Sequence, residues 1–458
     1  MACAIPLHPT RIHGSARLHR VLLGASSLLA LLAPALARAA SALPDAPAPV
    51  SAFLSDDRHL VDWVRDHDPS VAAARARVMQ GAADVGRAKV IPNPSVGFDL
   101  SNIAVGRTTP AGLGFGDMGI YSVQLQETVE LGKRGPRIDA AGLRLDEARL
   151  GFLDTLAGRV AEVREALANV AHRKARLDLL EQTRDEARTV VQLEKRRLEQ
   201  GDLSGNDFDR LAVDLMGLEA DAVQARAEHA SALADCAAAL TVPCDPGRSP
   251  EPLLDAAAPV PEDPADPGAR LMLRPDVEAV RLERDAARRD AVGALRKGIP
   301  DPTFSVGYTH DQFTVSGDNA NSLMVGVSFP LPVFDHGQHD AAKARGAALE
   351  QDAMRAVLLR QASASVTSLR ARKAALDESL KALADDAMPR SARVLDGTVK
   401  GLHQGQNSMT DLLLARRTHT TLILKVVDLR YEAFQVRNDL RRALGLDADL
   451  ARDAGTAP

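Results

Sequence analysis

A short window of the sequence, Ile299 to Gln338, interrupts long stretches of helical pattern and constrains the fold more than any other part of the chain. On each side of a turn region rich in glycine, asparagine and aspartate, Ser316 to Asn321, apolar residues alternate with small or polar residues. A period of two residues is typical of a β-strand with one apolar face. The window therefore predicts a long β-hairpin, with strands at about residues 302–314 and 321–332.

The same hairpin pattern occurs once earlier in the chain. The run IPNP at residues 91–94 matches IPDP at residues 299–302, and two alternating segments follow it on either side of a glycine-rich turn. These segments predict strands at about residues 94–105 and 119–130. An internal duplication is therefore the first architectural hypothesis.

Helical patterns fill the rest of each copy. The expected helices span residues 57–89, 132–200 and 206–240 in the first copy, and a segment up to residue 297, then 339–404 and 409–444 in the second. The longest helix of each copy is about 100 Å long at about 1.5 Å per residue, and the two shorter ones laid end to end nearly match it. Each copy therefore predicts two helical columns, and the chain predicts four columns beside four strands.

The N-terminus has the layout of a secretory signal peptide cut after Ala39, because basic residues precede an apolar run that ends in Ala37, Arg38 and Ala39. The alternative is a membrane anchor, but the run is shorter than the roughly 20 apolar residues that a helical span needs. The expected organisation is a signal peptide (1–39), a linker (40–56), a first repeat (57–242), an inter-repeat linker (243–270), a second repeat (271–446) and a disordered tail (447–458).

Composition excludes several function classes. The net charge of −5 over 458 residues gives no reason to expect nucleic-acid binding. Cys236 and Cys244 form either a local disulfide or two free buried thiols, and without clustered histidines they give no metal site. The sequence contains no glycine-rich phosphate loop, no HExxH and no nucleophile elbow, so we expect neither a cofactor nor an enzyme.

The strands are long enough to cross a membrane. A strand of roughly ten residues tilted by about 45° spans the hydrocarbon core of a bilayer. Four strands cannot close a barrel in lipid, where every backbone group needs a partner. An exported chain of this kind therefore predicts a barrel shared by several copies and extended by the helices as a tube, with a soluble pair of half-buried hairpins as the alternative.

Several motifs resemble the TolC family of outer-membrane efflux ducts over nearly the whole mature chain. They are PNP at residues 92–94, VELGKR at 129–134, RPD at 274–276 and FPLPVFD at 329–335, and they are similar to the CzcC-type branch, which serves pumps that export heavy-metal cations. The resemblance implies a mainly α fold with a membrane β-barrel contribution, in which a homotrimer has a twelve-stranded barrel in the outer membrane of a Gram-negative cell and an α-helical periplasmic tunnel.

The implied partners are a periplasmic adaptor (membrane fusion) protein, an inner-membrane RND transporter and outer-membrane lipid. The implied function is passive conduction of substrate, with heavy-metal cations as the expected cargo. The alternatives are the same duct for organic compounds or a secreted polypeptide, and a secreted coiled-coil structural assembly.

The resemblance also assigns roles to the two glycine turns at which columns reverse. The residues expected to contact the adaptor are Gly201, Asp202, Leu203, Ser204, Gly205, Gly405, Gln406, Asn407 and Ser408; the alternative is that both turns only cap helices. Asp411 is expected to ring the closed aperture and attract cations, with Leu414 and Asp207 as further gate residues, whereas a solvated helical aspartate is the alternative.

Other polar residues near the hairpins allow weaker interpretations. His310, Asp311, His336 and His339 are near one another in the sequence, but a strand separates them, so solvated loop positions are favoured over metal binding. Asp99 falls on the small-residue face, which predicts that it lines the lumen. Lys133 and Arg134 are expected to meet either lipid headgroups or acidic neighbours.

Overall fold

The computed structural model describes residues 48–103, 105–108, 111–247, 254–255, 257–260, 267–312 and 319–453. The chain divides into two units, Met1–Pro44 and Asp45–Pro458, and every described residue belongs to the second. The signal peptide expected over residues 1–39 lies outside the described residues.

The order helix, hairpin, long helix and returning helix occurs twice along the chain. The first copy consists of α3 (Pro69–Lys89), β2 (Ser95–Ser101), β3 (Ile120–Thr128), α5 (Arg134–Gln200) and α6 (Gly205–Leu240), with α4 (Phe115–Met118) between its strands. The second consists of α9 (Pro275–Leu295), η1 (Arg296–Gly298), β5 (Thr303–Asp311), β6 (Asn321–Ser328), α10 (Gln338–Ala382), α11 (Met388–His403) and α12 (Met409–Ala443). All four strands are shorter than the sequence predicts.

Two of the expected helices are interrupted. The helical stretch expected over residues 57–89, with an internal start near Pro69, consists of α2 (Asp57–His67) and α3, because Asp68 is extended and its side chain accepts hydrogen bonds from the N–H groups of Ser70 and Val71. The helix expected over residues 339–404 contains a single π-helical turn, η2 (Leu383–Ala387), between α10 and α11. Pro389 is the second residue after the turn, in the first turn of α11.

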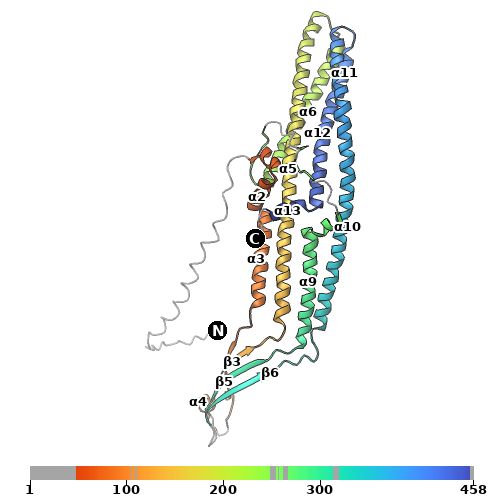
Figure 1. Cartoon of the computed structure of the whole chain (residues 1–458). Helices are drawn as coiled ribbons and strands as arrows, with labels where there is room; N and C mark the ends of the chain where they lie inside the picture. The colour runs from red at the N-terminus through yellow and green to blue at the C-terminus, as the bar shows by residue number, and fades with distance from the viewer. Residues whose placement is uncertain are drawn as a thin grey trace, which may run out of the picture. The chain divides into compact units, whose positions relative to one another are not determined.

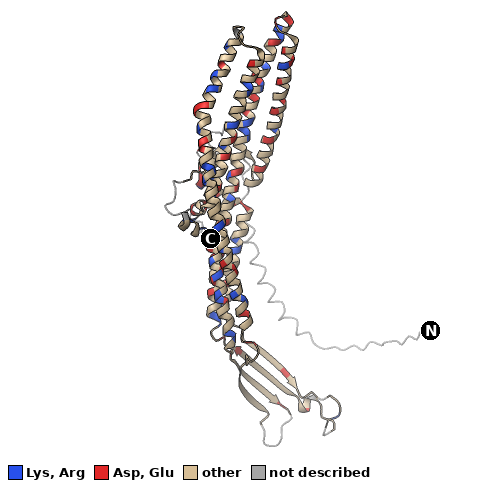
Figure 2. Ribbon diagram, turned by 90° about the vertical axis from the view of Figure 1, so that its right-hand side faces the viewer, with Lys and Arg blue, Asp and Glu red and all other residues tan. Residues whose placement is uncertain are grey.

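The helices form four columns. α5 packs against α3, α6, α9 and α12, and α10 packs against α9 and α12. In Figure 1, α3 and α6 follow one another along one side of α5, and α9 and α12 follow one another along the other side. The sheet lies at one end of the columns and the two helix-reversing turns lie at the opposite end (Figure 1). Figure 2 shows charged residues of both signs along the helices and few on the strands.

The largest part of the core lies where the N-terminal segment meets the middle of α5. Residues 40–56 were expected to be an extended linker, and this is wrong from Ala48 onward: Ala48–Pro49 is a strand, β1, and Val50–Ser55 is a helix, α1. Val50, Phe53 and Leu54 are buried against α5, because their three-to-four spacing gives the helix one apolar face. β1 pairs in parallel with β4 (Cys244–Asp245).

The segment after α12 is also ordered. The disordered tail expected over residues 447–458 is wrong up to Asp453, because Leu446–Asp453 forms a helix, α13, in which Asp447 is buried between two arginines. Residues 454–458 lie outside the described residues. Of the inter-repeat linker the structure describes β4, a short segment near Leu254 and α8 (Pro267–Met272). Cys236 and Cys244 form a disulfide, which decides between the two alternatives that the sequence left open.

Within the described ranges, none of the helices combines the length and the apolarity that a membrane-crossing helix needs.

Candidate functional site

The sheet has one continuous apolar face. Its strand order is β2-β3-β5-β6 and all its pairs are antiparallel. The register lines up two rows of large apolar side chains, Val96, Leu125, Val306 and Val325 in one row and Phe98, Val123, Tyr308 and Leu323 in the next. These side chains are exposed; Phe98 is 76% exposed and Leu323 is 73% exposed. An apolar surface that runs across four strands is a surface for lipid or for another chain.

The opposite face of the sheet is small and polar. One row consists of Asp99, Ser122, Thr309 and Ser322. Asp99 is therefore on the polar face, where the sequence placed it. The outer strands β2 and β6 each have one neighbour in the sheet, so the backbone groups on their other sides are open. The sheet has two distinct faces and two unfinished edges.

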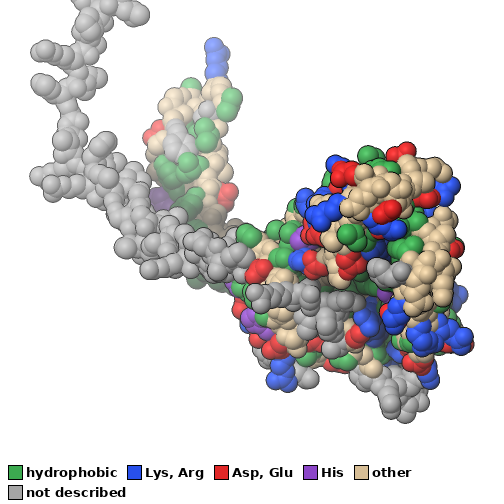
Figure 3. Space-filling view, turned by 90° about the horizontal axis from the view of Figure 1, so that it is seen from above, with side chains coloured by type: hydrophobic (Ala, Val, Ile, Leu, Met, Phe, Trp, Pro, Cys, Tyr) green, Lys and Arg blue, Asp and Glu red, His purple; other side chains and the backbone are tan. Residues whose placement is uncertain are grey.

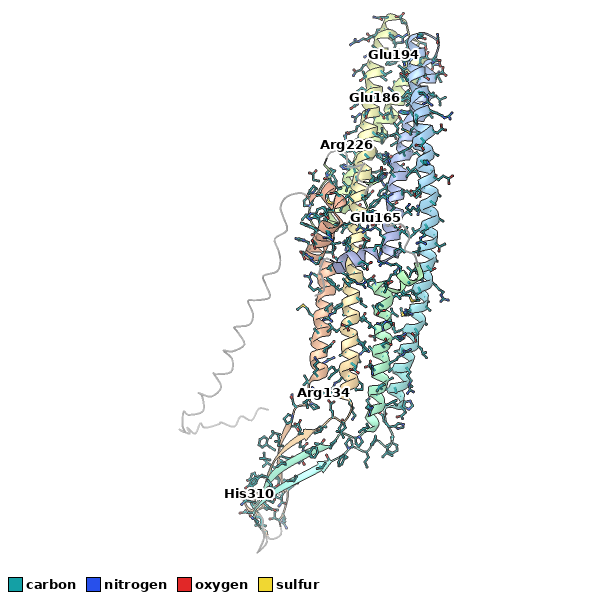
Figure 4. The ribbon with its side chains drawn as sticks, viewed as in Figure 1. Arg134, Glu165, Glu186, Glu194, Arg226 and His310 are labelled. Atoms are coloured by element: carbon teal, nitrogen blue, oxygen red, sulfur yellow. A yellow bond between two sulfur atoms is a disulfide. The ribbon has the colours of Figure 1, made fainter. Side chains whose placement is uncertain are left out.

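The two repeats are joined directly below the sheet. The Asp301 carboxylate accepts a hydrogen bond from the Leu131 N–H at 2.9 Å and pairs with Lys133 Nζ at 2.6 Å. Burial works to raise the pKa of Asp301, but the hydrogen bonds from Lys133 and from the Leu131 N–H outweigh it and lower the pKa below its usual range. Of the two alternatives for Lys133, the structure has the acidic neighbour. Arg134, at the foot of α5 in Figure 4, donates to the Lys89 carbonyl at 2.6 Å.

The first helix-reversing turn, residues 201–205, has the geometry of a capped helix pair. Gly201 has a left-handed backbone (φ 80°), which glycine adopts without strain, and its N–H donates to the Leu198 carbonyl at 3.0 Å. Ser204 caps α6 by accepting a hydrogen bond from the Asp207 N–H at 3.1 Å. Gly201, Asp202 and Gly205 are exposed.

The second turn, residues 405–408, repeats this geometry. Gly405 is left-handed (φ 70°), and its N–H donates to the Leu402 carbonyl at 3.1 Å. Ser408 caps α12 in a capping box, in which the Ser408 N–H donates to the Asp411 carboxylate at 2.9 Å and the Asp411 N–H donates to Ser408 Oγ at 3.2 Å. Both turns therefore cap helices, as the alternative interpretation of these turns expects. The exposed backbone of the turns remains available to a partner.

The three residues expected at the gate lie near this end, Asp207 on α6 and Asp411 and Leu414 on α12. The hydrogen bonds that Ser408 donates from its side chain and its backbone lower the pKa of Asp411. Asp207 accepts from Ser204 Oγ at 2.8 Å and lies 3.7 Å from Arg210. Leu414 lines a groove of about 730 Å³ between α6 and α12, whose floor includes Leu180 of α5. Seen from this end, the surface carries side chains of both charge signs between apolar ones (Figure 3).

α12, which carries Asp411, is held by different kinds of contact along its length. Near the turn, Met409 and Leu412 of α12 form a small buried apolar cluster with Leu211 of α6. Two exposed polar contacts join the same helices: Arg417 pairs with Asp214 at 3.3 Å, and Arg210 donates to Thr410 Oγ1 at 3.2 Å. Farther along, the Asp428 carboxylate accepts hydrogen bonds from Arg176 of α5 at 2.7 Å. Contacts between exposed ions contribute little to stability.

The far end of α12 is held by a buried network that the sequence analysis missed. Arg164 of α5 donates to the Asp447 carboxylate at 2.9 Å and to Asn438 Oδ1 at 2.9 Å, and Arg441 also donates to Asp447 at 2.9 Å. Asp57 of α2 pairs with both arginines. A signal for it was present, because Arg164 lies among the apolar core positions Val160, Val163 and Leu167 of α5.

The histidines do not converge. His310 lies at the far end of the sheet, away from the helices (Figure 4), and its Nδ1 is 3.0 Å from Asn321 Oδ1. His336 and His339 lie beyond the other end of β6, where the chain enters α10. No set of three or more histidine, cysteine, aspartate and glutamate side chains in the described part of the chain is arranged to hold a metal ion.

Taken together, a tandem pair of long helical hairpins and a four-stranded sheet with one apolar face define the class of architecture to which this protein belongs. The model of the family "Outer membrane efflux protein" matches residues 60–241 and 268–446. The chain belongs to this family, which confirms the resemblance found in its motifs and places the protein in the outer membrane of a Gram-negative cell.

Two curated relatives match most of the chain. The cobalt-zinc-cadmium resistance protein CzcC of Cupriavidus metallidurans is 26% identical over 387 residues, which cover 82% of this chain and 86% of the relative. Protein CyaE of Bordetella pertussis is 26% identical over 413 residues, which cover 84% of this chain and 85% of the relative.

Solved structures share the fold. CusC superimposes with a TM-score of 0.73 at 16% identity, over 88% of this chain and 95% of CusC. The outer membrane protein VceC of Vibrio cholerae superimposes with a TM-score of 0.67 at 20% identity, over 85% of this chain and 96% of VceC.

Proposed function

We propose that the protein is the outer-membrane duct of a tripartite RND-type efflux system, a homotrimer through which substrate passes passively from the periplasm to the exterior. The sheet is the observation that carries this proposal. Its apolar rows would face lipid, its polar rows would face a water-filled lumen, and its open edges would pair with those of neighbouring copies. Three copies of four strands give a closed barrel of twelve.

The sides of the helical columns support the same assembly. The outermost helices of the molecule, α3 and α10, have small and apolar residues on their exposed surfaces. These residues are Ala72, Ala76 and Met79 on α3, and Leu349 and Val357 on α10. Small and apolar residues allow close packing between helices, so these two faces fit one another in adjacent copies. The helices of three copies would then form the periplasmic tunnel below the barrel.

The cargo is proposed to be heavy-metal cations. The relative named as a cobalt-zinc-cadmium resistance protein supports this choice, since it matches this chain over most of both lengths. Substrate selection itself is assigned to the transporter. The protein's own contribution is the ring of Asp411 carboxylates, which would raise the local concentration of cations at the aperture.

The partners are proposed to be a periplasmic adaptor and an inner-membrane RND transporter. The exposed turns at residues 201–205 and 405–408 would receive the adaptor, because they are the parts of the columns farthest from the sheet (Figure 1). Opening would separate α12 from α6 near the turn, where the exposed polar contacts of Arg417 and Thr410 and the apolar cluster of Leu211, Met409 and Leu412 join them. The buried network at the other end of α12 would stay in place.

Fractionation of the native host tests the proposed location and assembly. The protein should be recovered from the outer membrane as a detergent-soluble trimer that forms a channel in planar bilayers. Recovery as a water-soluble monomer without conductance would refute the proposal and favour a secreted coiled-coil assembly.

Deletion of the gene tests the cargo. The deletion should sensitise the host to cobalt, zinc or cadmium salts and leave its tolerance of organic antibiotics unchanged. Sensitisation to organic compounds alone, or loss of a secreted polypeptide, would refute the metal assignment while the duct remained.

A further inference from the structure

The foot of the sheet, where the strands give way to helices, holds three basic side chains without a carboxylate partner among the residues that the structure describes. They are Lys89 at the end of α3, Arg134 at the start of α5 and Arg296 in η1, and all three are exposed. Arg134 donates to the Lys89 carbonyl at 2.6 Å, so these two residues are adjacent (Figure 4). The Arg296 side chain lies over Gly132, since a Cβ atom there would be 3.7 Å from Arg296 Nη1. We call these three residues the foot cations.

The carboxylates at the foot have partners of their own. The ion pairs are Glu130 with Arg137 at 2.7 Å, Asp301 with Lys133 at 2.6 Å, and Asp340 with Lys297. Asp335 accepts a hydrogen bond from the Gly337 N–H at 2.9 Å. The foot cations therefore carry positive charge that is left to water or to an anionic ligand.

Exposed apolar side chains adjoin the foot cations. These apolar residues are Val90 and Ile91, directly after Lys89, Leu131, three residues before Arg134, and Ile299, three residues after Arg296. A long basic side chain beside exposed apolar residues is typical of a membrane interface, because its stem covers apolar surface while its charge reaches the headgroups.

The chain after β6 exposes a longer apolar run, residues 329–334. Its exposed members are Phe329, Leu331, Val333 and Phe334, and Phe334 is 91% exposed. Phe329 and Leu331 continue the two-residue spacing of the apolar residues of β6. The run ends next to η1, since a Cβ atom at Gly298 would lie 3.6 Å from the Cβ atom of His336. The apolar face of the sheet thus extends to the foot cations.

Proline is frequent in the linkers at the foot. The prolines are Pro92 and Pro94 before β2, Pro300 and Pro302 before β5, and Pro330 and Pro332 after β6. Proline has no N–H group, so an irregular segment that contains it presents fewer unsatisfied donors to an apolar medium. This composition suits a backbone that lies at the boundary of the hydrocarbon region.

A second copy of the chain fits the foot less well than lipid does. The symmetry of the proposed trimer places the foot of each copy at the same height. A neighbouring copy would therefore bring the same cations and the same occupied carboxylates to this level. A phospholipid offers both an acyl chain for the apolar run and a phosphate for the cations.

We propose that the foot of the sheet binds anionic phospholipids of the periplasmic leaflet, with the foot cations on the lipid phosphates and residues 329–334 among the adjoining acyl chains. This inference rests on the proposed function, which places the sheet in the membrane and the helices on the periplasmic side. Guanidinium and ammonium groups form charge-assisted hydrogen bonds with phosphate oxygens. Three cations favour a headgroup with a net negative charge over one whose own ammonium compensates its phosphate.

Lipid binding by the full-length trimer in detergent tests the role of the foot cations. Native mass spectrometry should show phosphatidylglycerol bound in preference to phosphatidylcholine. Lys89→Gln with Arg296→Gln should weaken phosphatidylglycerol binding about thirtyfold, because each basic residue near an anionic lipid surface contributes roughly fivefold. Neither side chain forms a hydrogen bond or an ion pair with a residue in the described part of the chain, so the fold does not depend on them.

Lys195→Gln with Arg196→Gln is the matched control. It removes the same two kinds of charge from exposed positions near the opposite end of α5, and the affinity for phosphatidylglycerol should stay unchanged. Equal affinities of the two double variants, or equal binding of the two lipids, would overturn the role of the foot cations. Displacement of phosphatidylglycerol by an equal concentration of inorganic phosphate would overturn the lipid assignment. Absence of an outer-membrane trimer would instead count against the proposed function itself.

Leu331→Cys tests the apolar run. Cys236 and Cys244 are joined in a disulfide and Cys3 belongs to the expected signal peptide, so a thiol-reactive fluorophore labels position 331 alone. In vesicles of phosphatidylglycerol and phosphatidylethanolamine, nitroxide groups on the acyl chains should quench this fluorophore. The same fluorophore on Val213→Cys, an exposed apolar position of α6, should not be quenched. An unquenched position 331 in an intact trimer would show that water or a neighbouring copy covers the run, and it would overturn the lipid contact.

Discussion

The buried carboxylate of Asp447 is predicted to fix one end of α12, the helix that carries Asp411. Asp447 is 1% exposed and accepts four hydrogen bonds, two from Arg164 and two from Arg441. Asp447→Asn removes the charge while keeping the size of the side chain. Two buried guanidinium groups then retain one carboxylate partner, Asp57.

The expected loss in the free energy of unfolding follows from the geometry of these contacts. Removing one partner of a buried ion pair typically costs about 3–5 kcal/mol, and because Asp57 remains and asparagine keeps one acceptor, we expect the lower limit, about 3 kcal/mol. The reporter is Trp63, the single tryptophan of the chain, which lies on the same helix as Asp57 and donates to the Leu240 carbonyl at 3.2 Å. Its fluorescence during urea titration follows the detachment of α2 from the core.

The pH dependence of the protein's stability tests the same contact independently. Burial alone would raise the pKa of Asp447, but the charges of Arg164 and Arg441 and their hydrogen bonds lower it below its usual range. A lowered pKa in the folded state means that the stabilisation is complete above the unfolded pKa of about 3.9 and is lost as the pH falls toward the folded pKa. The unmodified protein should therefore lose this part of its stability below about pH 4, and Asp447→Asn should not.

Asp449→Asn is the matched control, because Asp449 is on the same short helix and pairs with Arg270 near the surface. A partly exposed pair is worth about 0–1 kcal/mol. The reasoning is refuted if both variants shift the Trp63 transition equally, or if the acid profile of Asp447→Asn matches that of the unmodified protein.

Three further predictions concern the aperture and the disulfide. Asp411→Asn should weaken the block of the reconstituted channel by divalent cations, and identical currents in both channels would contradict the gate role. Because hydrogen bonds from Ser408 lower the pKa of Asp411, the block of the unmodified channel should persist down to about pH 4 and fade below it. Arg417→Ala should raise the open probability in planar bilayers while costing less than about 1 kcal/mol of stability, and an unchanged open probability would show that the contact with Asp214 does not restrain α12. Cys236→Ser with Cys244→Ser should lower the stability reported by Trp63 by about 2 kcal/mol, and a coincident urea transition would exclude a stabilising role for this disulfide.

Much of the local structure follows from the sequence alone. The alternation in Val96, Phe98 and Leu100 identifies a strand and its apolar face, because side chains on a strand alternate between faces whatever the strand packs against. Gly201 and Gly405 mark the ends of columns, because a left-handed residue ends a helix locally. The internal duplication extends these predictions to the second half of the chain. The sequence also predicts that the sheet has open edges, since four strands are too few to close a barrel.

The sequence failed where a residue's role depends on distant partners. Asp447 and its neighbours look like a polar tail, and the carboxylate becomes a core residue because Arg164, far away in the chain, is buried beside it. Val50 and Phe53 follow a proline-rich segment and look like linker, but the apolar middle of α5 offers them a surface to cover. Local pattern determined the columns, the hairpins and the turns of this protein. The tertiary structure decided which charges are buried, because only the fold brings charges from distant parts of the sequence into a shared environment without water.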